Sequence, residues 1–203
     1  MRWVGGRVWE RGAVPRPTRA ELEAARALTV PDMLPGSGDP PLGVLFCGIN
    51  PGLVTALTGH HFGRPGNRFW PALHRGGFTP RLFQPADQDQ LLALGLGITN
   101  VVDRGSARAD ELTAAELRAG GVALAAKVVR YAPRWLAVLG VTAYRDAFDE
   151  RKASTGRQDR TIGPTRVWVL PNPSGLNASW TTPRLVGAFT DLRRAAGVGT
   201  DDV

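Results

Sequence analysis

The sequence predicts an α/β protein: a single-domain three-layer sandwich in which a short, mainly parallel central sheet is covered by helices on both faces. Short, continuously apolar runs bounded by turn residues alternate with stretches of helical periodicity. Strands that are apolar at every position are typical of parallel sheets, because both faces of such a sheet are covered. The 203 residues suffice for one domain with a full-sized core.

The first 41 residues are predicted to form an N-terminal extension with one helix rather than a second domain. Clusters of Gly and Pro surround a single helical stretch, TRAELEAARALTV. Its Thr18 and Glu21 have the spacing of a capping box, which marks the start of a helix. We expect the main domain to span residues 42–197 and a short C-terminal tail to span residues 198–203.

Four strands and three helices are predicted in the main domain. The strands are the apolar runs GVLFCGI (43–49), LGITNVV (96–102), WLAVLG (135–140) and RVWVLP (166–171). A long helix is predicted between the second and third strands, where Thr113 and Glu116 form a second capping box. A final helix is predicted over residues 182–196. Asn67 is expected to cap a shorter helix in the segment NRFWPAL.

The composition argues against several classes of protein. No run of about 18 apolar residues suggests a membrane span, and the N-terminus lacks the apolar core of a signal peptide. Cys47 is the only cysteine, which excludes an internal disulfide, a four-cysteine zinc site and an iron–sulfur cluster held by this chain's own thiolates. The three histidines are too irregularly spaced to predict a metal site. We expect a cytoplasmic protein, nucleoid-associated if bacterial, that uses no metal or cofactor.

The charge distribution is compatible with a polyanionic partner. The net charge is +7, and only two of the 25 basic residues are lysines. Residues 40–86 carry +4 and residues 151–190 carry +5, whereas residues 87–150 carry −2. Two segments therefore hold more positive charge than the whole chain, which favours a polyanion-binding face. A solvated basic surface explains the same charge equally well.

Three polar segments leave the carboxyl ends of the predicted strands. They are GINPGL (48–53), TNVVDRGS (99–106) and PNPSGLNASW (171–180). Ligands of such sheets bind beyond these ends, so Asn50, Asp103 and Asn172 are expected to face a common space. A phosphate-binding loop is disfavoured, because GxGxxG and Gly-Lys-Ser/Thr are absent and Pro51 removes a backbone N–H from the first segment.

These segments resemble the mismatch-specific uracil/thymine-DNA glycosylases within the uracil-DNA glycosylase superfamily. The similarity extends from about Gly43 to the last predicted helix and leaves the N-terminal extension outside. Four segments carry it: GINPG, HFGRPGNRFWPALHRGGF (61–78), TNVVDR and WVLPNPSGLN (168–177). Two short motifs at the correct strand ends are far more specific than either motif alone.

The resemblance implies a hydrolase of base excision repair that flips uracil out of DNA and hydrolyses its N-glycosidic bond. Thymine and damaged pyrimidines are further candidate substrates, mainly opposite guanine. The expected partner is double-stranded DNA with a G:U or related mismatch, and the expected state is a monomer. Because a stacked base cannot be reached, such an enzyme needs a pocket, an aromatic platform and a side chain that fills the vacated space.

By this resemblance, Asn50 positions the attacking water and Phe62 stacks on the flipped base, while Asn172 contacts the base. Leu176 is the wedge that enters the hole left by flipping. An asparagine amide orients a water but cannot accept its proton at neutral pH, so the base must leave as a stabilised anion. Structural alternatives are a turn for both asparagines, core packing for Phe62 and an inward-facing Leu176.

The resemblance also implies roles for the residues around these four. Ile49 and Thr55 are predicted to contact the base. DNA contacts are predicted for Ser174, Gly175, Asn177, Arg64 and Arg184. The chain departs from the family pattern after the wedge, where Asn177 and Ala178 replace a small hydroxyl residue and a basic one. Loss of that cation would weaken reading of the opposite guanine and would favour single-stranded uracil DNA as a substrate; Arg184 or the basic loop 151–160 are the candidates to supply the charge.

Asp103 is the second catalytic candidate. A carboxylate beside a developing oxocarbenium ion can stabilise it or take a proton from water, as paired carboxylates do in glycosidases. The alternative is a turn aspartate that pairs with Arg104 or caps its loop. No strand scission is expected, because the amine nucleophile of a bifunctional glycosylase is usually a lysine and Lys127 and Lys152 fall on a helix and in a remote loop.

Two other classes of function stay open. A non-catalytic DNA-binding module on the same fold would account for the basic segments but not for the pocket residues, and it predicts binding without base release. A small-molecule-binding flavodoxin-like domain predicts a bound chromophore or nucleotide, with weak and strongly salt-sensitive binding to DNA.

Overall fold

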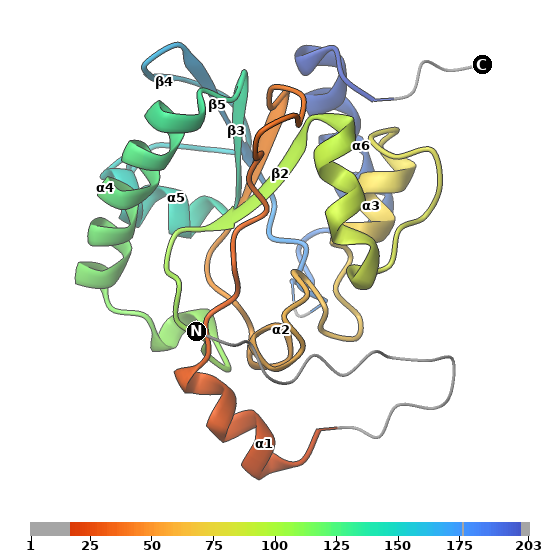
Figure 1. Ribbon diagram of the computed structural model, residues 1–203. Helices are drawn as coiled ribbons and strands as arrows, with labels where there is room; N and C mark the ends of the chain where they lie inside the picture. Colours follow the sequence, from red (N-terminus) through yellow and green to blue (C-terminus); the bar gives the residue numbers. More distant parts are fainter. Residues whose placement is uncertain (1–16, 176, 200–203) are drawn as a thin grey trace.

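The computed structural model describes residues 17–175 and 177–199, and in this part of the chain the strands form one five-stranded sheet (Figure 1). The strand order is β2-β1-β3-β5-β4, and all neighbours run parallel except β4, which is antiparallel to β5. The strands are β1 (Val44–Gly48), β2 (Leu96–Asn100), β3 (Trp135–Leu139), β4 (Gly156–Ile162) and β5 (Thr165–Leu170). The predicted α/β class is confirmed.

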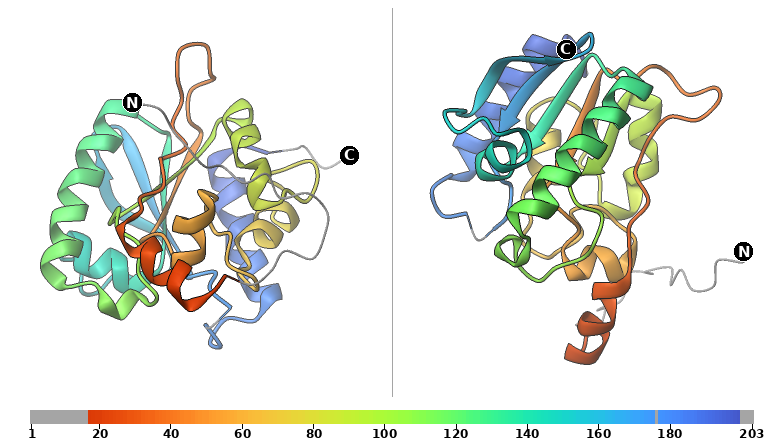
Figure 2. Two further views of the ribbon diagram at one scale, coloured as in Figure 1. Left: turned by 60° about the horizontal axis from the view of Figure 1, so that its bottom comes forward. Right: turned by 90° about the vertical axis from the view of Figure 1, so that its left-hand side faces the viewer.

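Helices cover both faces of the sheet, which makes the three-layer sandwich that the sequence predicts (Figure 2). α4 and α5 lie on one face, and α3, α6 and η2 lie on the other, whereas α1 and α2 lie at the carboxyl ends of the strands (Figure 1). The α-helices are α1 (Arg19–Ala24), α2 (Leu53–Thr58), α3 (Phe69–Arg75), α4 (Ala114–Tyr131), α5 (Val141–Phe148) and α6 (Thr182–Ala196). The 3-10 segments are η1 (Ala25–Ala27), η2 (Pro85–Leu94) and η3 (Ala109–Glu111).

Successive residues of β1 enter opposite hydrophobic layers. Val44 and Phe46 pack with the α3 and α6 side, whereas Leu45 and Cys47 pack with the α4 and α5 side. All four are fully buried. Since side chains alternate between the faces of a strand, burial on both faces requires an apolar residue at every position. This requirement explains the continuous apolar runs and makes β1 the centre of the core.

The helix-capping pairs that the sequence predicts form where the two residues lie close along the chain. Both capping boxes form, one at α1 and one at α4. The sequence predicts Asn67 as the cap of α3, but the N-cap position is Arg68; Asn67 lies one residue earlier, and its Oδ1 accepts a hydrogen bond from Phe69 N at 2.9 Å. The final helix occupies the predicted residues 182–196.

The basic segment 151–160 differs from its prediction as a loop. Its second half begins β4, which pairs with β5 from Gly156 onward. Most β4 side chains are exposed, because this strand lies at the sheet edge. An edge strand held by backbone hydrogen bonds needs no apolar pattern, so no such pattern marks it in the sequence.

Residues 29–33, which belong to the predicted N-terminal extension, cover the free edge of β2. Met33 N donates to Ile98 O at 2.8 Å, and Ile98 N donates to Met33 O at 3.0 Å. Asp32 forms an ion pair with Lys127 of α4. An uncovered edge strand would present unpaired backbone groups, so this segment completes the sheet.

Among the helices of the described residues, none is long and apolar enough to cross a membrane.

Candidate active site

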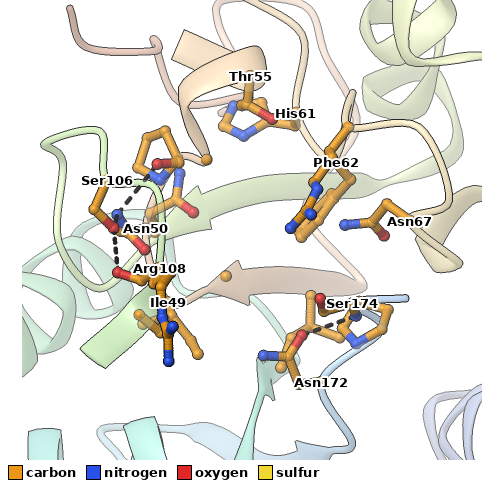
Figure 3. A pocket seen from close by; sticks show the side chains of 18 of the residues that line it. Ile49, Asn50, Thr55, His61, Phe62, Asn67, Ser106, Arg108, Asn172 and Ser174 are labelled. Atoms are coloured by element: carbon orange, nitrogen blue, oxygen red, sulfur yellow. Dashed lines mark hydrogen bonds between the residues drawn. The ribbon is translucent and has the colours of Figure 1, made fainter. Parts of the chain in front are cut away.

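A pocket opens at the carboxyl ends of the parallel strands, among the segments that follow β1, β2 and β5 (Figure 3). Its volume is about 130 Å³. One water requires roughly 10–15 Å³ by this measure, so the pocket is large enough for a ring-sized ligand. The residues that line it come from 48–55, 61–67, 100–109 and 172–174, together with Leu139 of β3.

The side chain of Asn50 is held by its amide nitrogen. Asn50 Nδ2 donates to Ser106 Oγ at 2.8 Å, to Arg104 O at 3.0 Å and to Pro51 O at 3.1 Å. Arg104 O and Pro51 O are carbonyl oxygens and can only accept. Ser106 Oγ accepts from Asn50 Nδ2 because it donates its own proton to Arg108 O at 2.7 Å. These contacts set the orientation of the amide and leave Asn50 Oδ1 as an acceptor for a further donor.

The backbone around Asn50 is joined to the segment that follows β2. Val101 N donates to Gly48 O at 2.9 Å, Val102 N donates to Ile49 O at 3.0 Å, and Ser106 N donates to Pro51 O at 3.1 Å. Three backbone hydrogen bonds therefore connect the two strand exits. A Cβ at Gly48 would lie 2.6 Å from Asn100 Oδ1, so a larger residue here would displace the Asn100 side chain that lines the pocket.

Phe62 presents an aromatic ring on the opposite side of the pocket from Asn50 (Figure 3). The ring stacks on Phe69, with centroids 4.0 Å apart and planes at 22°. Phe62 has a φ of 54°, in the left-handed region that a non-glycine residue rarely adopts. Such strain costs about 1–3 kcal/mol and persists where the surrounding structure enforces it. The ring is thus fixed on one face by Phe69.

His61 precedes this ring and is fixed by three contacts. His61 Nε2 donates to Pro31 O at 2.9 Å, His61 N donates to Gln88 Oε1 at 2.8 Å, and Trp70 Nε1 donates to His61 O at 3.1 Å. Because a carbonyl accepts from Nε2, the neutral ring carries its proton there and Nδ1 is an acceptor. Burial lowers the pKa of His61, which keeps the ring neutral. Pro31 therefore lets the N-terminal segment support the pocket.

Asn172 lines the pocket from the exit of β5. Its Oδ1 accepts a hydrogen bond from Ser174 N at 2.9 Å, and its backbone carbonyl accepts one from Asn177 Nδ2 at 3.0 Å. The first bond orients the Asn172 amide, so that Nδ2 is available as a donor. Asn50 and Asn172 thus offer opposite polarities to a ligand: an acceptor oxygen and a donor nitrogen.

The mouth of the pocket carries positive charge. Arg64 and Arg108 both line the pocket and both are exposed. Arg108 forms an ion pair with Asp110 at 2.6 Å, and this bond raises the pKa of its guanidinium. A second ion pair supports the wall: Arg104 Nε lies 2.5 Å from Glu116 Oε1 and lowers the pKa of Glu116 to about 2.

The structure brings together most of the residues that the sequence singled out. The pocket is lined by Asn50, Phe62, Asn172, Ile49, Thr55, Arg64 and Ser174. Four others lie outside its lining: Asp103, Gly175, Asn177 and Arg184. Leu176 falls outside the described residues. Asp103 is exposed, and Arg184 lies over the ring of Trp180 at 4.9 Å.

Several other lining residues were not predicted as site residues, among them Asn67, Asn100, Ser106 and Arg108. Asn100 and Ser106 lie within the segment TNVVDRGS, and the signal that could have identified them is its position after a buried strand. Side chains on a short exit segment point in different directions, so only the tertiary structure distinguishes those that face the pocket.

Site and fold together define a protein with a pocket beyond the carboxyl ends of a parallel sheet, where ligands of such sheets bind, and with two arginines in its lining. The chain matches the uracil DNA glycosylase superfamily over residues 35–193. This match covers most of the chain, and the protein belongs to that superfamily. It is thus a DNA-acting hydrolase of the general uracil-DNA glycosylase kind.

Proposed function

We propose that this protein is a monofunctional uracil-DNA glycosylase of the mismatch-specific type. It flips uracil out of DNA, mainly from opposite guanine, and hydrolyses the N-glycosidic bond; thymine and damaged pyrimidines are candidate further substrates. The arrangement that carries this proposal is the Asn50 amide, whose nitrogen is engaged by three acceptors while its oxygen stays available across the pocket from the Phe62 ring.

In the proposed reaction, Asn50 Oδ1 accepts a hydrogen bond from a water. This bond directs the water oxygen at C1′ of the deoxyribose. The water oxygen forms the new bond to C1′ as the bond from C1′ to N1 breaks, and the electron pair stays on the departing base. The proton of the water passes to solvent, because an amide cannot take it at neutral pH. Catalysis then depends on stabilising the uracil anion.

Asn172 is proposed to stabilise that anion and to recognise it. Its available Nδ2 donates to a carbonyl oxygen of uracil, a bond that strengthens as negative charge develops on the base. The amino group of cytosine offers a donor where uracil has a carbonyl, so the same contact disfavours cytosine. Phe62 provides the stacking surface, and Ile49 and Thr55 bound the base from the strand exit and α2.

The contacts around the segment WVLPNPSGLN (168–177) support uracil release that depends only loosely on the base opposite. Asn177 Nδ2 donates to Asn172 O, so this side chain is used within the loop. Ala178 has no charge to offer. Arg184 lies over Trp180 at the start of α6 and is proposed to contact DNA in place of the missing cation. We therefore expect single-stranded uracil DNA to be accepted beside G:U duplexes.

Simple hydrolysis without strand scission is proposed because neither lysine of the chain lines the pocket. Lys127 bonds Asp32 and, at 2.8 Å, Thr99 Oγ1, while Lys152 is exposed in a turn. The proposal includes a monomeric, cytoplasmic enzyme. The specific competing function is a non-catalytic DNA-binding module, which the basic residues at the mouth also suit.

A single-turnover assay tests the proposal. Labelled duplexes carrying G:U, A:U or G:T and single-stranded uracil DNA are incubated with excess protein, and abasic sites are revealed by alkali. We expect release from G:U, slower release from the other substrates, and no cleavage before alkali. Release from no substrate, with DNA binding intact, would leave the DNA-binding module as the function.

A further inference from the structure

Arg68 connects the segment that carries Phe62 to the loop that follows β5. Arg68 Nη1 donates to Trp180 O at 2.5 Å, and Nη2 donates to Ser174 O at 2.9 Å and to Asn177 O at 3.0 Å. Its backbone N–H donates to Pro173 O at 3.0 Å. One residue therefore holds four carbonyls of residues 173–180, more than 100 positions away along the chain.

The three carbonyls that meet the guanidinium lie on both sides of Leu176 along the chain. Without Arg68, all three carbonyls would lose their guanidinium donor, although Ser174 O would keep the hydrogen bond that Asn177 N donates at 3.0 Å. The guanidinium suits this role because its rigid, planar fork presents several donors at once and stays charged. Arg68 is therefore the long-range attachment of residues 173–175 and 177–180, beside the local hydrogen bonds that Asn172 and Asn177 make within this loop.

Close backbone packing supports the same junction. A Cβ added at Gly175 would lie 2.6 Å from Gly66 O, so the two segments are as near as glycine permits. Gly66 itself has a φ of 80°, in the left-handed region that favours glycine. Two glycines and one arginine thus join the segment 61–68 to the segment 173–180.

We infer that Arg68 is a positioning residue that holds the loop 173–180 in the conformation that enters DNA, and that couples this loop to the ring of Phe62. This inference rests on the proposed function in one respect, the use of the loop in base flipping. Arg68 itself does not line the pocket, so its effect on the reaction is exerted through the loop.

The two kinds of substrate separate this role from a catalytic one. A stacked and paired base has to be extruded, and a loop that fills the vacated space assists extrusion. Uracil in a single strand has no partner and needs no such assistance. Loss of Arg68 should therefore slow release from a G:U duplex about tenfold to a hundredfold, the usual effect of a displaced positioning group. Release from a single strand should change little.

The matched variants are Arg68→Lys, Arg68→Ala and Gly175→Ala, with Arg145→Ala as the control. Arg145 also holds a loop, by two donors to one carbonyl, Ala153 O. This loop does not line the pocket, so Arg145→Ala removes a comparable attachment away from the site. Lysine keeps the charge without the fork, so Arg68→Lys should give an intermediate loss. Gly175→Ala keeps Arg68 but separates the segments, and it should reproduce the duplex-specific loss.

Amide hydrogen exchange tests the structural part without any activity. Backbone amides of residues 173–180 should exchange at least about tenfold faster in Arg68→Ala, the equivalent of one lost hydrogen bond. In Arg145→Ala they should exchange as in the unmodified protein. Thermal unfolding of each variant distinguishes a local change from general destabilisation.

Faster amide exchange in the loop, together with slower uracil release from duplex substrate only, supports the inference. Unchanged exchange overturns it, as does an equal loss on duplex and single strand at an unchanged melting temperature, which would assign Arg68 to the pocket. A protein that releases no uracil from any substrate overturns the proposed function alone, because the exchange experiment still decides whether Arg68 holds the loop.

Discussion

The exits of β1 and β5 both bring an asparagine to the pocket, but they are held in different ways. The β1 exit is joined to the neighbouring β2 exit by successive backbone hydrogen bonds, and Asn50 is fixed by three acceptors. The β5 exit has β3 and the antiparallel β4 as neighbours, and its loop is held by Arg68 and by hydrogen bonds of Asn172 and Asn177 within the loop.

This difference corresponds to two mechanical requirements. A group that aims a water tolerates little displacement, since misplacement by about 1 Å can cost a hundredfold in rate. A loop that enters a duplex has to meet a deformable partner, and a side-chain attachment can be altered more easily than a strand pairing. We therefore expect changes at the β1 exit to affect every substrate and changes at the β5 exit to depend on the substrate.

Replacement of Asn50 by Ala should give the largest effect. The water loses its acceptor, so single-turnover release should fall about a hundredfold or more on duplex and single strand alike. Asp103→Ala is the matched control at the neighbouring exit, and we expect it to be nearly unchanged because Asp103 is exposed outside the pocket lining. A larger loss in Asp103→Ala than in Asn50→Ala would reverse these roles.

Asn172→Ala should give the next largest effect. Removal of the proposed hydrogen bond to the uracil anion should slow release about tenfold to a hundredfold on both substrates, since a bond to a charged group contributes about 1.5–3 kcal/mol. The loss on single-stranded DNA distinguishes this variant from Arg68→Ala. If Asn172→Ala affected only duplex DNA, Asn172 would act through the loop rather than on the base.

Ser106→Ala should give a smaller effect at the β1 exit. Asn50 Nδ2 loses its shortest bond, 2.8 Å, but keeps the carbonyls of Arg104 and Pro51. Loss of one neutral hydrogen bond, about 0.5–1.5 kcal/mol, should slow release about twofold to tenfold on every substrate. Ser106→Thr retains the hydroxyl and should restore the rate; failure of this rescue would argue against the hydrogen bond as the cause.

The smallest effect concerns His61 and is a pH dependence of stability. Burial lowers the pKa of the folded-state ring, so the unfolded chain binds a proton first as the pH falls. The contribution of His61 to the free energy of unfolding is therefore complete above the unfolded pKa of about 6.5 and is lost as the pH falls below it. Denaturant unfolding between pH 8 and pH 5 should show this decline, and His61→Gln should reduce it. Parallel profiles for the two proteins would contradict the assignment to His61.

The polar exits were predictable because they follow from two local features: an apolar run and the turn residues after it. GINPGL and PNPSGLNASW stand after buried strands in the sequence, and parallel strands present their carboxyl ends at one edge of the sheet. Within the third exit the sequence singled out the charged Asp103, whereas the structure places the neighbouring Ser106 in the pocket lining and Asp103 outside it. Residue type is visible in a sequence, but the direction of a side chain on an irregular segment is not.

The sequence by itself determined the layered α/β class, the capping boxes, the last helix and the presence of asparagines at two strand exits. Each of these depends on residues close along the chain or on burial that leaves an apolar pattern. Only the tertiary structure decided that Arg68 holds the loop 173–180, that Pro31 orients His61 and that a polar segment becomes β4. These are contacts between distant residues or between backbone groups. The physical reason is that backbone carbonyls are identical in every residue, so a donor that binds them leaves no mark in the sequence of its partner.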